Sequence, residues 1–447
     1  MVTFKIAWRD IIRQRARSWL TIAAISFCTA VLLITMAFAR GGHQQMIQSG
    51  VSMFPGHFQL QLIGYQQDPA LAKCFSVPEK FLAEMDADER VRGAVPRIVS
   101  QGLVNSADKD QTAGAMMIGT RPGPERKTTK LAGNVQQGVF LEEGKEGFAI
   151  VGKTMGENLG VAPGEEIRIF TQTLYGSMEM DGYTVKGYVY SGDPEMDRSL
   201  VLLPLKDTQR LLRMESEDLI NHVAVVLESP RFLEEVFEKA RGLVFELNAP
   251  RYAQIAKQNA EILESPFNRS SYTKARYIMH RPDLKVLVKW QELMPDLVEF
   301  VFLDNAGAVL YVAILVIVVA FVILLTVLMS VLERTREFGV MMAIGTRPNR
   351  LFRMIMIEAF LLALVGIVAG LLLGSIPAYY FNSHPIDISA YAEMARQFGM
   401  EPSISTIVLP VMYPATAGII LFITILVSFF PARRAGKVEP VEALRHV

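Results

Sequence analysis

Four long stretches of the chain carry no Asp, Glu, Lys or Arg. They cover residues 19–39, 306–332, 359–386 and 402–432. About 20 consecutive apolar residues are enough for a helix to cross the hydrocarbon core of a bilayer. The second stretch is apolar all round, whereas a surface helix of a soluble protein keeps one solvated face. The pattern therefore predicts four transmembrane helices, at residues 19–40, 306–332, 356–376 and 406–431.

Three prolines lie near the ends of the last two helices. Pro377 predicts that the third helix ends early, because proline lacks a backbone N–H and collides with the preceding turn. Pro410 and Pro414 predict that the fourth helix starts late or with a kink.

Lys and Arg gather in three short segments that flank the helices. Because positively charged flanks stay in the cytoplasm, we expect both termini and the 333–355 loop to be cytoplasmic. Residues 41–305 and the short 377–405 loop are then outside. The basic segments are residues 1–18, 333–355 and 432–447.

The first of these segments has apolar side chains at helical spacing. Phe4, Trp8 and Ile11 alternate with basic residues, so residues 1–18 are predicted to form an amphipathic helix at the cytoplasmic surface. An ordinary basic flank is the alternative. A cleaved signal peptide is a second alternative, since residues 37–39 read Ala-Phe-Ala, but the basic and apolar segments are both long for a signal.

Residues 41–305 have the composition of a soluble domain. Short β-branched and aromatic runs predict strands, and apolar residues at helical spacing predict helices. The expected strands are 57–63, 148–151, 166–171, 183–189, 200–203 and 222–227. The expected helices are 78–85, 205–214, 230–243 and 252–263. This pattern predicts a mixed α+β ectodomain of one or two lobes, which moves when the first two membrane helices move.

Residues 147–154 (GFAIVGKT) match the Walker A pattern of nucleotide-binding loops. A phosphate loop needs flexible residues between its glycines, whereas Phe148–Val151 have the character of a strand. No later strand offers an Asp for magnesium. We therefore expect a strand-to-helix turn at Lys153, and no ATP hydrolysis by this chain.

Composition narrows the classes of function. The 447 residues include 45 basic and 45 acidic ones, a balance that argues against a nucleic-acid binder. Cys28 lies in a predicted span and Cys74 outside, which excludes a disulfide between them. The six histidines lack the spacing of a metal site, and no catalytic motif is present. We therefore expect a protein that is not an enzyme and holds no cofactor or metal.

The loop after the second helix has its own pattern. Interleaved charges give way to an apolar run that stops at Gly345, a residue typical of helix ends. An exposed apolar helix is costly, so this segment is predicted to contact a soluble partner or the membrane. The candidate residues of this segment are Glu333, Arg334, Glu337, Phe338, Gly339, Met341, Met342 and Gly345.

Small residues recur every four positions on the third helix. Gly366, Gly370 and Gly374 form a stripe that permits close helix packing. Packing within the subunit is favoured, and a seam between two copies of the chain is the alternative. The absence of charges in the spans favours an amphiphilic or apolar substrate, although a chain that only transmits force would look the same.

Three segments carry the clearest signature. They are the segment Glu333–Gly345, the glycine-rich third helix and the tail PARRAGKVEPVEALRHV. These segments resemble the FtsX/MacB-type ABC transporter permease family, most closely its LolC/LolE lipoprotein-releasing branch, and 333–345 would be the coupling helix of that family. In the outer region, VGKTMGENLGVAPGEEIRIF, YTVKGYVYSG and Trp290–Leu293 are similar to the outer domain of that family. The resemblance extends over nearly the whole chain.

The resemblance implies a permease in the bacterial inner membrane, with a MacB-like periplasmic core between helices one and two. It implies a second permease copy or homologue, and a separate ABC ATPase dimer that binds ATP and Mg and docks at the 333–345 segment. The implied substrate is a lipoprotein or lipid-like molecule, extracted by mechanotransmission. A MacB-like exporter with a periplasmic adaptor and an FtsX-like regulator of cell-wall hydrolases are the alternatives.

Two segments depart from the branch. Residues 171–182 are short where LolC-like chains carry a hook that recruits a periplasmic carrier. Use of a carrier is therefore left open. Residues 246–283 are longer than the branch leads us to expect, and the pattern assigns them no role.

Overall fold

A computed structural model describes residues 15–107, 109, 111–258, 283–387 and 403–436. The chain divides into two compact units. Among the described residues, one unit holds 15–45, 300–387 and 403–436, and the other holds 46–107, 109, 111–258 and 283–299. Residues 1–14 of the amphipathic helix predicted at 1–18, and most of the tail, lie outside the described residues.

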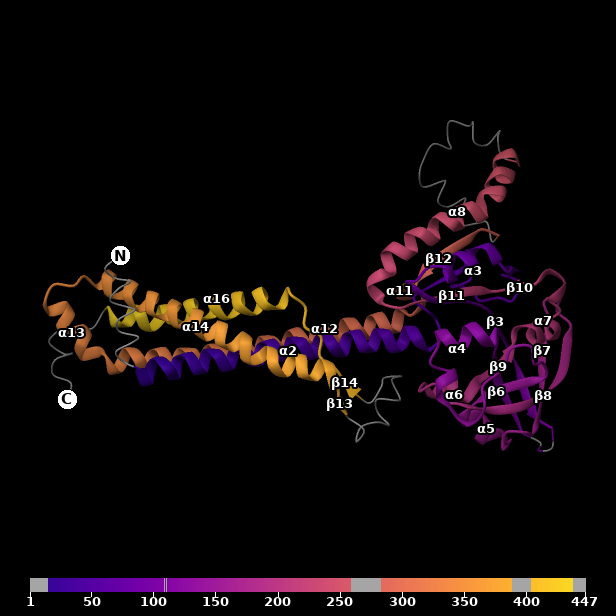
Figure 1. Cartoon of the computed structure of the whole chain (residues 1–447), viewed down its shortest axis with the longest axis horizontal. Helices are drawn as coiled ribbons and strands as arrows, with labels where there is room; N and C mark the ends of the chain where they lie inside the picture. Colours follow the sequence, from indigo (N-terminus) through magenta and orange to yellow (C-terminus); the bar gives the residue numbers. More distant parts are fainter. Residues whose placement is uncertain (1–14, 108, 110, 259–282, 388–402, 437–447) are drawn as a thin grey trace. The chain divides into compact units, whose positions relative to one another are not determined.

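The first unit is built on four helices that are long and apolar enough to cross a membrane. They run side by side in Figure 1 and share a core that includes Ile25, Ile323, Ala363 and Ile420. The first two extend well past the charge-free stretches, because those stretches mark only the apolar part of each helix. The four helices are α2 (Arg15–Met53), α12 (Pro295–Glu333), α14 (Pro348–Ser383) and α16 (Met412–Ala435).

The predictions made from the prolines hold for α16 but not for α14. Helix α14 continues through Pro377 to Ser383, so the prediction of an early end is wrong. Pro377 removes only the hydrogen bond that the carbonyl of Leu373 would accept, and a single loss of this kind is tolerated inside membrane helices. Helix α16 begins at Met412, which confirms the predicted late start. Pro414 lies in its first turn, where a backbone N–H has no helical partner.

The second unit is an α/β domain around one ten-stranded sheet in the order β12-β1-β11-β3-β4-β9-β6-β8-β5, with β7 pairing β3 and β8. Two short strand pairs are separate from this sheet. Strand β2 (Phe75–Ser76) pairs with β10 (Leu219–Ile220). Strand β13 (Ile386–Asp387) pairs with β14 (Ser403–Ile404), and this second pair belongs to the first unit. The main strands are β1 (Phe58–Leu62), β3 (Val91–Ser106), β4 (Thr112–Thr120), β5 (Val135–Gly138), β6 (Phe148–Gly152), β7 (Glu166–Gln172), β8 (Met178–Val189), β9 (Leu200–Pro204), β11 (His222–Leu227) and β12 (Lys285–Lys289).

The helices of this domain pack on the sheet over separate cores. Phe58 and Phe81 belong to a core beneath β1, β11 and the helices α3 and α8. Val151 and Tyr183 belong to a second core beneath β6 to β8 and α5. The helices are α3 (Glu79–Asp86), α4 (Pro122–Thr128), α5 (Lys153–Leu159), α6 (Pro194–Ser199), α7 (Leu205–Leu211), α8 (Leu233–Gln258) and α11 (Trp290–Leu293). Three short 3₁₀ turns span Ala132–Asn134, Glu215–Glu217 and Pro230–Phe232.

The Walker-like segment has the local structure expected from its sequence. Residues Phe148–Gly152 form strand β6, and helix α5 begins at Lys153. The predicted strand-to-helix turn is therefore confirmed. A side chain at Gly152 would collide with the backbone of Asp197, so the glycine is needed for close packing.

Candidate functional site

The loop between α12 and α14 contains the short helix α13 (Thr335–Ala343). Its end is the Schellman arrangement, in which the N–H of Gly345 bonds to Met342 O and the N–H of Thr346 to Met341 O, each at 3.0 Å. Gly345 has a φ of +97°, which glycine adopts without strain. The helix end predicted at Gly345 is therefore confirmed.

One face of α13 is packed into the chain itself. Phe338 is only 1% exposed and Gly339 is buried as well. Met341 and Met342 pack partly against the same cluster. The cluster joins the ends of α12, α14 and α16, and its other buried members are Val331, Leu351, Met354, Ile355, Ala432 and Ala435.

Arg334 connects α13 to α14 through an ion pair. Its guanidinium lies 2.7 Å from the carboxylate of Glu358 in α14 and 3.1 Å from that of Glu337. The same guanidinium lies 5.0 Å from the centre of the Phe338 ring. The side chains of Arg334 and Glu358 are only 5% and 10% exposed. Removing one partner of a pair this deeply buried costs about 3–5 kcal/mol, because the other charge loses its compensation.

A small cavity lies beside this ion pair. Its volume is about 20 Å³, and Thr21 of α2, Phe338 and Leu362 are among its lining residues together with the pair. A space of this size has room for about one water molecule. The pair is therefore enclosed by α2, α12, α13 and α14.

The opposite face of α13 is open. Val340 is 45% exposed and Ile344 is 79% exposed. These two residues are four positions apart, so they lie on one face of the helix. Glu333 and Glu337 are exposed as well. The apolar docking surface of α13, formed by Val340 and Ile344, is thus separate from the buried face.

This arrangement corrects one expectation from the sequence. Phe338 was expected to contact a partner or the membrane, whereas it is buried within the chain, so a charge there would disturb the helix ends. The apolar partners of Phe338, such as Leu351 and Ala435, lie far along the chain, and a local pattern cannot show them. Sequence reasoning also missed Glu358, whose only signal was a single acidic residue at the edge of a charge-free stretch.

The glycine stripe lies against α2. A Cβ atom added at Gly366 would lie 2.8 Å from Ile25, and one at Gly374 would lie 2.9 Å from Ala30. At Gly370 it would lie 2.5 Å from the carbonyl oxygen of Ser26. The three glycines therefore permit α14 and α2 to approach closely within one subunit.

The segment that is short relative to LolC-like chains forms a tight hairpin between β7 and β8. The N–H of Thr173 bonds to Ser177 O at 2.8 Å and closes the turn. Tyr175, Met178 and Met180 are exposed on this hairpin. Within the described residues, no longer loop projects from residues 171–182.

Comparisons with known proteins bear on both units. Residues 18–243 match the MacB-like periplasmic core domain, and residues 309–440 match the FtsX-like permease C-terminal family. The chain is 23% identical to "Lipoprotein-releasing system transmembrane protein LolC" of Xylella fastidiosa, over 96% of this chain and 94% of the relative. It is 38% identical to "Macrolide export ATP-binding/permease protein MacB" of Pectobacterium atrosepticum, over 26% of this chain and 16% of that protein.

Among solved structures, the periplasmic region of MacB from Actinobacillus actinomycetemcomitans is similar over 46% of this chain and 90% of that structure. The TM-score is 0.33 and the sequence identity 11%. The MacB-like match covers just over half of the chain, and the FtsX-like match covers its last three membrane helices. The chain therefore belongs to the FtsX-like ABC transporter permeases that carry a MacB-like periplasmic core domain.

Proposed function

We propose that this permease works with a separate ABC ATPase dimer to extract lipoproteins, or another lipid-like substrate, from the bacterial inner membrane. In this proposal ATP and magnesium bind to the partner ATPase, and both termini and α13 lie in the cytoplasm. The α/β domain lies in the periplasm. The similarity to a lipoprotein-releasing protein over 94% of its length supports the choice of substrate.

The observation that carries the proposal is the two-sided structure of α13. Its docking surface, Val340 and Ile344, is apolar and exposed. Its other face is fixed to α12, α14 and α16 through Phe338 and the Arg334–Glu358 pair. A partner that moves α13 therefore moves the ends of three membrane helices together.

The membrane helices support an apolar or amphiphilic substrate. Helix α12 is the most exposed of the four, since only 17% of its most apolar window is buried, against 39–44% in the others. That surface is available to lipid, to an acyl chain or to a second permease copy. Polar solutes and ions would require charged groups near the centre of the spans.

The docking surface can be tested by substitution. Ile344→Asp and Val340→Asp place a charge on the exposed face and should abolish binding of the ATPase, because a buried unpaired charge at an interface is costly. The chain itself should stay folded, since neither side chain is part of the buried cluster. The measurement is the amount of ATPase that copurifies with the tagged permease in detergent.

Ile386→Asp is the matched control. Ile386 is 37% exposed and lies in strand β13, after the other end of α14. This variant should bind the ATPase like the wild type. Normal binding by Ile344→Asp would refute the assignment of the docking surface.

The MacB-like alternative is favoured by one observation, the tight β7–β8 hairpin with its exposed Tyr175 and Met178, which offers a surface for a periplasmic adaptor. Depletion of the permease separates the two functions. The proposal expects outer-membrane lipoproteins to accumulate in the inner membrane. Normal lipoprotein sorting would favour the adaptor-linked exporter or the FtsX-like regulator instead.

A further inference from the structure

Helix α2 is continuous from Arg15 to Met53, so it links the membrane unit to the α/β domain. The last carbonyl groups of a helix have no partner within the helix and must find one elsewhere. In α2 the carbonyl of Val51 accepts from the N–H of Gly56 at 3.0 Å. The carbonyl of Ser52 accepts from the N–H of Lys130 at 3.2 Å. The end of α2 is therefore tied to the α/β domain through its own backbone.

Arg97 provides the strongest of these ties. One terminal nitrogen of its guanidinium donates to the carbonyl of Phe54, directly after α2, and the group lies 4.3 Å from the centre of the Phe54 ring. The other two nitrogens donate to the two carboxylate oxygens of Glu125, at 2.9 and 2.6 Å. A cation is favourable at this position, because the C-terminal end of a helix carries a partial negative charge.

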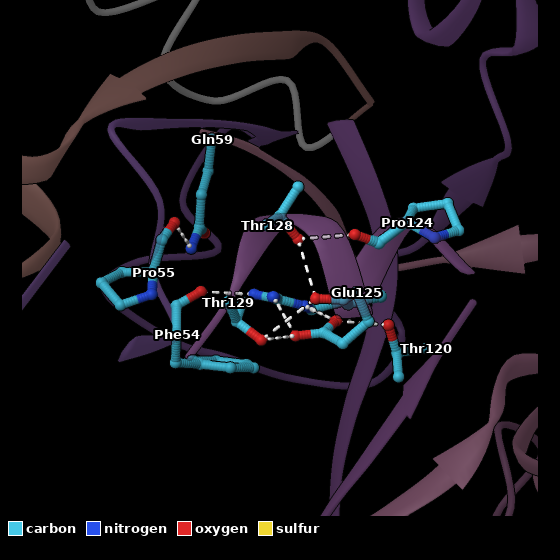
Figure 2. A network of polar contacts seen from close by, with 9 residues as sticks. Phe54, Pro55, Gln59, Thr120, Pro124, Glu125, Thr128 and Thr129 are labelled. Carbon is cyan, nitrogen blue, oxygen red and sulfur yellow. Dashed lines mark hydrogen bonds and ion pairs between the residues drawn. The ribbon is translucent and has the colours of Figure 1, made fainter. Parts of the chain in front are cut away.

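Glu125 is held in turn by two hydroxyl groups. Thr120 donates to it at 2.5 Å and Thr129 at 3.0 Å. Figure 2 shows Thr120 and Thr129 around the Glu125 carboxylate, with Phe54 joined to the same network. The side chains of Arg97 and Glu125 are fully buried. The pair is thus locked in one geometry, with every charged oxygen bonded.

Arg97 lies in the interior of the sheet. It is in strand β3, directly opposite Thr120 in β4 on one side and His222 in β11 on the other. Helix α12 connects to the sheet differently. It follows α11 and β12, and among the described strands β12 is an edge strand that pairs with β1 alone. Helices α2 and α12 are therefore connected to different parts of the sheet. The end of α2 contacts the interior strand β3, whereas α12 follows the edge strand β12.

A buried ion pair contributes little net stability, since apolar residues of similar volume are often as stable or more so. The ion pair instead fixes the orientation of the end of α2 relative to strand β3. The rigid fork of Arg97 bonds the carbonyl after α2 and both oxygens of Glu125 at once.

We propose that Arg97 is a positioning residue that transfers movement of α2 to the interior of the sheet. This inference rests on the proposed function, because it takes the movement of α2 to be driven by an ATPase bound at α13. Without the Arg97–Glu125 pair, α2 would move while the sheet lagged behind it. ATP would then be hydrolysed with less substrate released.

The test compares two double variants with the same chemistry. Arg97→Met with Glu125→Leu removes the buried pair. Arg92→Met with Glu228→Leu removes a half-exposed pair, with a separation of 3.2 Å, that joins the same strand β3 to the residue directly after β11. Arg97→Lys is a further variant that retains the charge but not the fork, in case the first double variant does not fold.

The first readout needs no partner. Amide hydrogen exchange of residues 46–56 in the purified full chain should become at least tenfold faster in the Arg97/Glu125 variant and in Arg97→Lys, with strands β6 to β8 unchanged. The Arg92/Glu228 variant should exchange like the wild type. Unchanged exchange of residues 46–56 would overturn the proposal whatever the protein transports.

The second readout is the amount of lipoprotein released per ATP in the permease–ATPase complex. It should fall at least fivefold in the Arg97/Glu125 variant while ATP hydrolysis stays within twofold of the wild type. An unchanged ratio in the folded variant would overturn the role of Arg97. Absence of release by the wild-type complex would instead refute the proposed function, and the exchange result would still decide whether Arg97 fixes the end of α2.

Discussion

Gly370→Ala tests the close packing of α14 on α2. A Cβ atom at this position would lie 2.5 Å from both the carbonyl oxygen of Ser26 and the Cβ of Thr29. Ordinary van der Waals contact begins at about 3.4 Å, so the two helices must separate by roughly 1 Å along this stretch. Backbone atoms make part of the contact and cannot rotate away as a flexible side chain would.

The magnitude follows from two opposing effects. Overpacking in a tight interface costs about 1–3 kcal/mol. Replacing a glycine inside a helix by alanine stabilises the folded state by about 0.5–1 kcal/mol. We expect a net loss of about 1–2 kcal/mol, which corresponds to a fall in Tm of about 1–2 °C for a chain of this size.

The assay is thermal unfolding of the purified permease in lipid nanodiscs. Gly418→Ala in α16 is the matched control, because nothing lies within 4 Å of a Cβ atom added there. It should be as stable as the wild type or slightly more stable. If Gly370→Ala unfolds at the wild-type temperature, the glycine stripe does not hold α2 and α14 together as described.

Three further predictions concern the ion pair at α13, the buried histidines and the Walker-like turn. Glu358→Leu should destabilise the permease by about 3–5 kcal/mol, because it leaves Arg334 without its main counter-charge. Adding Arg334→Met to the same chain should restore most of the Tm. Equal Tm values for the single and double variants would contradict this prediction. Burial lowers the pKa of His57 to about 4 and that of His222 to about 3. The folded state then binds fewer protons than the unfolded state, so stability is complete above about pH 6.5 and decreases as the pH falls. The free energy of unfolding should fall by about 3 kcal/mol near pH 4 through His57 alone, and hydrogen exchange of the sheet measures this fall. The His57→Gln variant should show a weaker pH dependence of stability than a control variant at the exposed His384. Lys153→Ala should leave ATP hydrolysis by the permease–ATPase complex unchanged, and a loss of turnover would revive the nucleotide-binding interpretation of residues 147–154.

The membrane helices were predictable from the sequence because charge is segregated so strongly. A charge-free stretch requires only local information, and each of the four stretches corresponds to one helix. The extensions of α2 to Met53 and of α12 back to Pro295 were not predicted, since these parts have ordinary polarity. They matter for function, because they lead into the α/β domain.

The strands were predicted where β-branched residues run together, and missed where they do not. Strand β3 contains Gly93, Pro96 and Gly102, which are typical of turns, yet it lies at the centre of the sheet. It is stabilised by pairing with β4, β7 and β11, which are distant in sequence for the most part. Tertiary contacts here override local preference.

The candidate site was predicted as a segment but not as a surface. The pattern identified α13 and its end at Gly345, whereas the choice of Phe338 as the buried side depends on Leu351, Met354 and Ala435. The Arg334–Glu358 pair joins residues 24 positions apart, and the Arg97–Glu125 pair residues 28 apart. No local periodicity connects such residues, so only the structure reveals these pairs.

The most direct test of the account is ATP-dependent lipoprotein release from proteoliposomes that contain the permease and its ATPase. The account predicts release of an acylated lipoprotein that requires ATP, is lost in Ile344→Asp and is retained in Ile386→Asp. ATP hydrolysis without release by the wild-type complex, or normal release by Ile344→Asp, would contradict it.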